Sequence, residues 1–158
     1  MKRTTAVGVT SKGLALLGVI VIAMLATGCG SDSKTSDAAF KKDAKAATAK
    51  VTKLGDDIGL AIQTAGTTPD AELGKTFDAL TARGRTIIGD LKALKPPDSA
   101  KQRVDDLIAA LTTGARDLDA IATAVHASDG KAAGAATRTL ATDSPAIKSA
   151  RVALEGQL

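Results

Sequence analysis

The stretch V-D-D-L-I-A-A-L-T-T-G-A-R-D-L-D-A-I-A-T-A-V, from Val104 to Val125, decides the fold. Its large apolar side chains recur every three or four residues, and its charged side chains fall between them. That spacing places the apolar residues on one stripe of an α-helix, which needs other elements to bury it. The stripe consists of Val104, Leu107, Ile108, Leu111, Ala115, Leu118, Ile121 and Val125.

Three further segments share this helical period and have similar lengths. They are separated by turn and breaker residues at Gly66-Thr67-Thr68-Pro69, Pro96-Pro97 and Ser128-Asp129-Gly130. Helices are therefore expected over about 37–65, 69–95, 98–127 and 130–157, and no alternating β-branched run indicates a strand. The predicted fold is all-α, an antiparallel up-down-up-down four-helix bundle over 37–158. Because the apolar phase of the last segment continues past Pro145, we expect one helix kinked at that proline.

Charge and composition exclude several classes of function. The formal net charge is +4 at pH 7, but Lys2, Arg3 and Lys12 lie in an opening segment without acids, and the rest of the chain is almost balanced. No cluster of basic residues follows Gly28, and Phe40 and Phe77 are the only aromatic residues. Nucleic-acid binding, which needs basic patches and stacking platforms, is therefore not expected.

The opening segment has the three parts of a secretory signal peptide. A basic start, Met1 to Gly13, precedes the uncharged apolar run Leu14 to Ala26. That run is shorter than the ~20 apolar residues of a membrane span. Residues 1–28 are therefore predicted to be a signal peptide that is removed after export.

The sequence Ala26-Thr27-Gly28-Cys29 ends this segment and contains the single cysteine of the chain. It resembles the lipobox of bacterial lipoproteins, although that family prefers Leu where Ala26 stands. The resemblance implies cleavage between Gly28 and Cys29, lipidation of the Cys29 thiol, and a place at the outer face of the cell membrane. Residues 29–36 would then form the lipidated cysteine and a flexible tether. The whole chain is similar to small helical-bundle lipoproteins predicted in high-GC, actinobacterial genomes.

Two alternatives to lipidation stay open on the residues alone. Ala26-Thr27-Gly28 also fits an ordinary small-residue cleavage site, which would release a protein with a free thiol at Cys29. A signal peptide that is not cleaved would instead act as an anchor helix. The lack of a second cysteine favours lipidation, because an exported protein with one free thiol tends to form intermolecular disulfides.

The middle of the predicted bundle brings small residues to one level, and this layer is the candidate ligand site. Its members are Gly84, Gly114, Ala115 and Ser144. Small residues at one level either let the helices pack closely or leave a small apolar pocket. Close packing is the favoured interpretation, and the pocket is the alternative.

Other conspicuous residues have structural explanations. Gly55 and Gly59 are expected to mark a bend or a close helix contact, since nearby aspartates exclude a membrane dimer motif. His126 has no cysteine partner, and even with Asp119 and Asp129 it makes a poor metal site. The acidic pairs Asp56-Asp57 and Asp105-Asp106 are typical of solvated helix faces, and Arg83 and Arg85 of surface charge.

The sequence thus predicts a membrane-tethered envelope protein that binds or scaffolds a partner and is not an enzyme. No nucleophile, base and orienting group come together, and no phosphate-binding loop follows a strand. No cofactor or metal is expected. The alternative function is a carrier that holds a small lipophilic ligand inside the bundle. An enclosed cavity would favour the carrier, whereas an exposed apolar surface on the first or last helix would favour partner binding.

Overall fold

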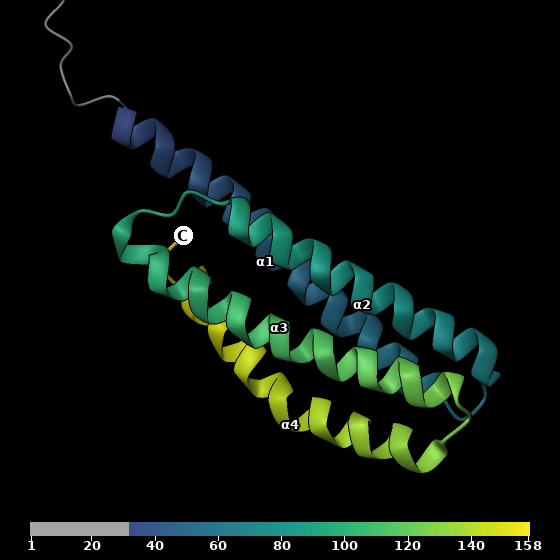
Figure 1. The fold of residues 1–158 in the computed structure, drawn as a ribbon. Coiled ribbons are helices and arrows are strands. Elements are labelled where there is room, and N and C mark those ends of the chain that lie inside the picture. The colour runs from purple at the N-terminus through teal and green to yellow at the C-terminus, as the bar shows by residue number, and fades with distance from the viewer. Residues whose placement is uncertain (1–31) are drawn as a thin grey trace, which may run out of the picture.

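The computed structural model describes residues 32–158, and within this range the chain forms four α-helices and no strand. They are α1 (Asp32–Thr64), α2 (Asp70–Ala93), α3 (Asp98–His126) and α4 (Gly130–Glu155). The prediction of an all-α four-helix bundle is confirmed (Figure 1). The predicted signal peptide, Cys29 and the start of the tether lie outside the described residues.

Ion pairs between helices define how neighbours run. Lys50 of α1 pairs with Asp90 of α2 at 2.8 Å, and Asp57 of α1 pairs with Arg83 of α2 at 2.6 Å. Residue numbers rise along α1 as they fall along α2, so these helices run in opposite directions. The same opposed order holds between α2 and α3, in the ion pairs Asp78–His126 and Arg85–Asp119. The C-terminus and the α2–α3 connection therefore lie at the end of the bundle where α1 begins (Figure 1).

The start of α1 differs from the sequence-based expectation. The helix begins at Asp32 rather than near residue 37, so residues 32–36 of the predicted flexible tether are helical. An acidic residue at the first position suits the positive end of the helix dipole, and the strong helix formers Ala38 and Ala39 follow less than two turns later. The segment left between Cys29 and the helix is therefore very short.

The helix ends shift because the capping groups are not all where the sequence suggests. Pro69 is the N-cap of α2, so the helix begins at Asp70 instead of at residue 69, and the Thr68 hydroxyl donates to the carbonyl of Thr64 at 2.9 Å. Asp129 does cap α4, accepting a hydrogen bond from the backbone N–H of Ala132 at 2.9 Å. The α2 helix ends at Ala93, because residues that precede prolines favour extended backbone.

The α4 helix continues through Pro145 without interruption. Proline cannot donate a backbone hydrogen bond to the preceding turn. Next to it, the Ser144 hydroxyl donates to the carbonyl of Leu140 at 2.7 Å, a contact made within the same turn. The kink at Pro145 stays a prediction.

The core is built mainly by α2 and α3, and the predicted stripe of α3 is its centre. That stripe is buried from Val104 to Val125, apart from the half-buried Ile108. In contrast, α4 buries only Leu140 and Leu154. It packs extensively on α3 and only lightly on α1, so the α1–α4 side is the loosest of the four helix contacts. The largest fully buried side chains are Phe77, Leu91, Leu107, Leu118, Ile121 and Leu154.

This distribution makes Leu118 a sensitive position for stability. Its side chain is only 2% exposed, so Leu118→Ala should lower the free energy of unfolding by about 2–5 kcal/mol. Leu60 of α1 is 60% exposed, and Leu60→Ala should change that free energy by less than about 0.5 kcal/mol. Urea unfolding followed by circular dichroism measures both variants. Equal losses would show that the core is not centred on α3.

Candidate binding groove between α1 and α4

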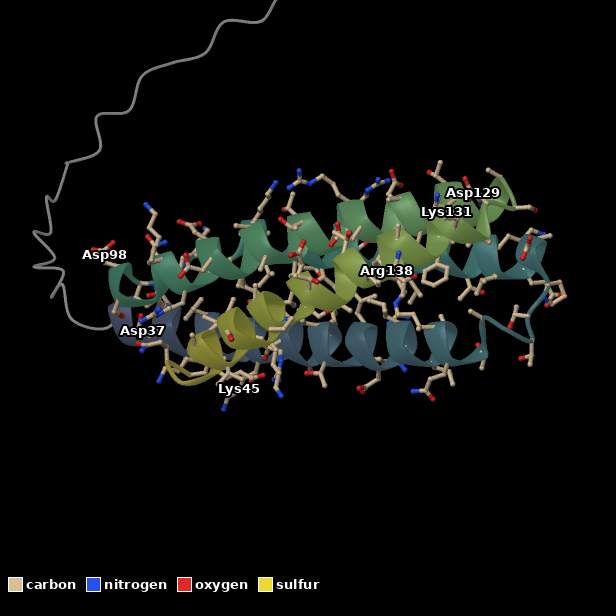
Figure 2. The ribbon with its side chains drawn as sticks, turned by 90° about the horizontal axis from the view of Figure 1, so that it is seen from below. Asp37, Lys45, Asp98, Asp129, Lys131 and Arg138 are labelled. Carbon is tan, nitrogen blue, oxygen red and sulfur yellow. The ribbon has the colours of Figure 1, made fainter. Side chains whose placement is uncertain are left out.

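The α1 and α4 helices pack closely at one end and separate toward the other. On the side of α1 that faces α4, Ala44 and Thr48 are 0% and 3% exposed, but Ile62, further along the helix, is 36% exposed. Leu154, near the end of α4, is fully buried. In Figure 2, α4 crosses α1 near the C-terminus and lies beside α3 at its other end, where Lys131 is labelled.

This divergence leaves an apolar groove with a volume of about 280 Å³. One wall comes from Val51, Gly55 and Ile58 of α1, and Leu111 of α3 also lines the groove. The wall from α4 is smaller and more polar, because it includes Ser144 beside Leu140 and Ile147. Exposed residues lie along the mouth, among them Gly55, Asp56 and Lys148, so the groove is open to solvent.

The charged groups at the mouth differ in their pairing. Arg151 donates to both carboxylate oxygens of Glu155, at 2.7 and 2.8 Å, and is held within its own helix. Lys148 and Asp56 form no ion pair within residues 32–158. The groove therefore combines an apolar interior with one cation and one anion available at its edge.

Three of the four residues of the predicted ligand layer, Gly84, Gly114 and Ala115, line one small space in the middle of the bundle. A Cβ atom built on Gly84 would lie 3.7 Å from Leu54 and 3.9 Å from Ala115, which is ordinary contact. Gly114 is closer still, because a Cβ there would lie 2.8 Å from Cδ1 of Ile147. The helices have closed on these small residues, and the enclosed void that they share measures only about 20 Å³. That volume holds about one water molecule.

The fourth residue, Ser144, lies on the groove instead of the void. Leu54, Ile58, Leu111, Leu140 and Ile147 line both spaces, so the void lies directly beneath the groove. These five apolar residues were not among the residues predicted to form a site. One feature of the sequence could have indicated the groove. The apolar stripe of α4 is weak, with small and polar residues at positions where the stripe of α1 has Val and Ile.

The expectation for Gly55 and Gly59 is wrong in one respect. No close helix contact occurs at either glycine, since a Cβ atom built on either would meet nothing within 4 Å. Gly55 instead lines the open groove. Both glycines therefore leave α1 accessible along the side that faces the groove.

Two larger hollows in the described region are less suited to an apolar ligand. One, of about 490 Å³, lies between α1 and α2 and is crossed by the ion pair of Asp57 with Arg83. The other, of about 710 Å³, is a shallow surface between α1 and the end of α4, lined by Lys45, Lys53 and other polar side chains. Neither includes the large buried residues of α3.

The remaining candidate residues form structural ion pairs. Nε2 of His126 lies 2.8 Å from Oδ2 of Asp78 in α2, whereas Asp119 pairs with Arg85 and Asp129 caps α4. Arg83 and Arg85 thus bind acids of different helices. The hydrogen bond from Arg83 lowers the pKa of Asp57 below the ordinary value for an aspartate. Among the described residues, no three His, Cys, Asp or Glu side chains lie close enough to hold a metal ion.

Asp117 of α3 is the one acidic group in an unfavourable place. Burial raises its pKa above the ordinary value for an aspartate, and the negative charge of Asp143 in α4 raises the pKa further, against a smaller opposing effect of Arg116. Its Oδ2 atom is buried and has no hydrogen-bond partner in the described part of the chain. Two carboxylates therefore face each other where α3 and α4 pack.

Comparison of the chain with models of known families, with curated proteins and with solved structures finds no match. None of the helices in residues 32–158 combines the length and apolar character needed to cross a membrane. The properties of the groove therefore rest on its own residues.

The carboxylate pair gives a pH-dependent prediction. Because the folded state raises the pKa of Asp117, its contribution to stability is present at low pH and is lost as the pH rises through the folded-state value. Asp117→Asn should therefore raise the melting temperature at pH 7 and change it little at pH 3. Asp105→Asn removes an exposed aspartate of the same helix and should give no comparable gain. Thermal melts at both pH values test this, and a loss of stability in Asp117→Asn at pH 7 would contradict it.

Proposed function

We propose that this protein is a membrane-tethered, non-catalytic binding module of the cell envelope that receives apolar side chains of a partner protein in the α1–α4 groove. The groove is the observation that supports this function. It combines an apolar interior with an accessible mouth. Further along α1, Gly59 has open space around it and Ile62 is partly exposed. An accessible apolar surface of this kind marks an interaction site.

The shape of the groove favours a protein partner over a small lipophilic ligand. A carrier shields most of its ligand from water, and typical ligand pockets bury 70–90% of the ligand surface. The enclosed space here is only about 20 Å³, and the larger space of about 280 Å³ is open. A partner helix brings its own polar outer face, so only its apolar side chains need to enter the groove.

The proposed tether rests on the opening sequence. A basic start, an apolar run and the lipobox-like Ala26-Thr27-Gly28-Cys29 together support export, cleavage before Cys29 and lipidation of its thiol. The proposed absence of catalysis rests on the chemistry of the groove. Its polar members, Thr52 and Ser144 among them, include no histidine, and the one histidine of the chain is bonded to Asp78 at the bundle end.

The tether predicts how a single substitution redistributes the protein. Cys29→Ser removes the thiol that would carry the lipid, so the variant should move from the membrane fraction to the soluble fraction of the envelope. Fractionation followed by mass spectrometry of the N-terminal peptide measures both location and lipid mass. Retention of the variant in membranes would show that another feature anchors the chain.

The groove predicts where a partner can be captured. A photo-crosslinking residue at Ser144, on the groove, should give an adduct with one protein in intact cells, whereas one at Thr142, exposed on the same helix, should not. Gly55→Leu should fill the groove and reduce the Ser144 adduct at least tenfold. Gly89→Leu is the matched control, because Gly89 is equally open but lies on α2.

The outcomes separate the two functions. An adduct of lipid mass at Ser144 that Gly55→Leu abolishes would support the carrier instead. Equal adducts at Ser144 and Thr142, or an adduct that Gly55→Leu leaves unchanged, would show that the groove is not the binding site.

A further inference from the structure

The side of α1 that faces away from α2 and α3 is basic, and it borders the shallow surface beside the end of α4 that Lys45 and Lys53 line. The prediction that no cluster of basic residues follows Gly28 is wrong for this face. It carries Lys41, Lys42, Lys45 and Lys53, all exposed and interrupted by the small residue Ala49, and we refer to these five residues as the outer face of α1. Figure 2 shows Lys45 pointing away from the bundle. The acid closest in sequence, Asp43, lies instead in a hollow shared with α2.

These lysines are largely unused by the fold. Lys41, Lys42 and Lys45 form no ion pair in the part of the chain that the structure describes, and Lys53 makes only a long contact of 3.7 Å with Asp57. Asp57 is already bonded to Arg83 at 2.6 Å. Lys41, Lys42 and Lys45 lie within about one turn of each other and repel, so this part of the outer face costs stability unless anions lie against it. Lys53 lies two turns further on, where Asp56 and Glu155 share its surface.

The position of α1 relative to the proposed anchor indicates which anions are near. Only two residues, Gly30 and Ser31, lie between Cys29 and Asp32, where the helix begins, and an extended chain spans at most about 10 Å from Cys29 to Asp32. The start of α1 would therefore lie about one Debye length from the lipid headgroups. With 33 residues the helix is roughly 50 Å long, and Lys41 lies about 14 Å from its start.

Two orientations of the bundle follow from this geometry. If α1 stood upright on the membrane, Lys41 and Lys45 would lie beyond the range of the surface potential. If α1 lay along the membrane, the whole outer face would meet the headgroups. Each basic residue close to an anionic surface strengthens binding about fivefold, so three lysines favour the lying orientation by on the order of a hundredfold.

We infer that the outer face of α1 binds anionic lipid headgroups and holds the bundle flat on the membrane that anchors it. The inference rests on the proposed lipid anchor at Cys29. None of the five outer-face residues has a large apolar side chain, and the exposed Leu60 follows on the same side two turns beyond Lys53, so the contact is mainly electrostatic, reversible and weakened by salt. Gly55 lies about a quarter turn around α1 from Lys45, so the α1–α4 groove would open sideways, parallel to the membrane surface.

The test uses the lipidated full-length protein purified from its own membranes and reconstituted in vesicles. Because lipidation consumes the Cys29 thiol, a cysteine introduced by Ala49→Cys can be labelled alone with a fluorophore, and Ala120→Cys on α3 gives the reference label. Headgroup-linked nitroxide lipids quench a label that lies at the surface. With phosphatidylglycerol at 30% in phosphatidylcholine, the Ala49→Cys label should be quenched and the Ala120→Cys label should not.

Charge reversal and salt define the mechanism. Quenching at position 49 should fall at least tenfold in pure phosphatidylcholine, in 1 M salt, and in the triple variant Lys41→Glu, Lys42→Glu, Lys45→Glu. The triple variant Lys75→Glu, Lys101→Glu, Lys131→Glu changes net charge equally on other helices and should retain it. Circular dichroism checks that both variants keep their helices.

The contrary results are distinct. A label at position 49 that is not quenched, or is quenched equally without anionic lipid, would overturn the inference while leaving the anchor intact. Protein that does not float with the vesicles would overturn the proposed lipid anchor, and with it the inference.

Discussion

The apolar stripe of α3 is the constraint on which the rest of the structure depends. It is buried on both sides, by α2 and by α4, and it supplies three of the six largest fully buried side chains, Leu107, Leu118 and Ile121. At its middle, Gly114 and Ala115 allow both neighbours to approach closely. Because α4 has few large apolar residues, it gains most by packing on this stripe, and its contact with α1 is correspondingly small.

The position of α1 follows from the same preference. Its apolar residues pack mainly toward α2, and the ion pairs Lys50–Asp90 and Arg83–Asp57 add to that contact. Such partly exposed ion pairs each add at most about 1 kcal/mol to the free energy of unfolding. They therefore help to set the orientation of α1 but contribute little to its attachment to the bundle. The side that faces α4 is left incompletely covered beyond Thr48. The groove is thus a consequence of uneven packing among four helices, and not a separate structural element.

The sequence predicted the features that depend on local spacing. The period of apolar residues and the prolines at Pro69 and Pro96-Pro97 identified four helices within a few residues of their ends. That Gly84 lies near Gly114 and Ala115 was also predictable, because helices of similar length joined by short connections bring their midpoints together. The early start at Asp32 was missed, because weak helix formers before Ala38 hid it.

The groove could not be predicted, because it depends on whether α4 packs more tightly on α3 or on α1. The sequence shows that α1 and α4 each have an apolar stripe, but not that α4 is drawn toward α3 over half of its length. For the same reason the expected contact at Gly55 and Gly59 did not occur. Periodicity gives the face of each helix that is buried, whereas the separation of two helices depends on all the side chains between them.

Ile147 of α4 takes part both in the packing of α4 on α3 and in the lining of the groove. Its Cδ1 atom rests against Gly114 and so fixes the approach of α4 to α3, and its side chain also lines the groove. On the same interface, Asp117 and Asp143 repel each other when both are charged. The contact of Ile147 with Gly114 holds α4 against α3 in spite of the repulsion between Asp117 and Asp143. Any side chain that entered the groove and displaced Ile147 would therefore weaken this contact. The width of the groove and the closeness of α3 to α4 are coupled through one side chain, because interiors packed at this density transmit displacement instead of absorbing it.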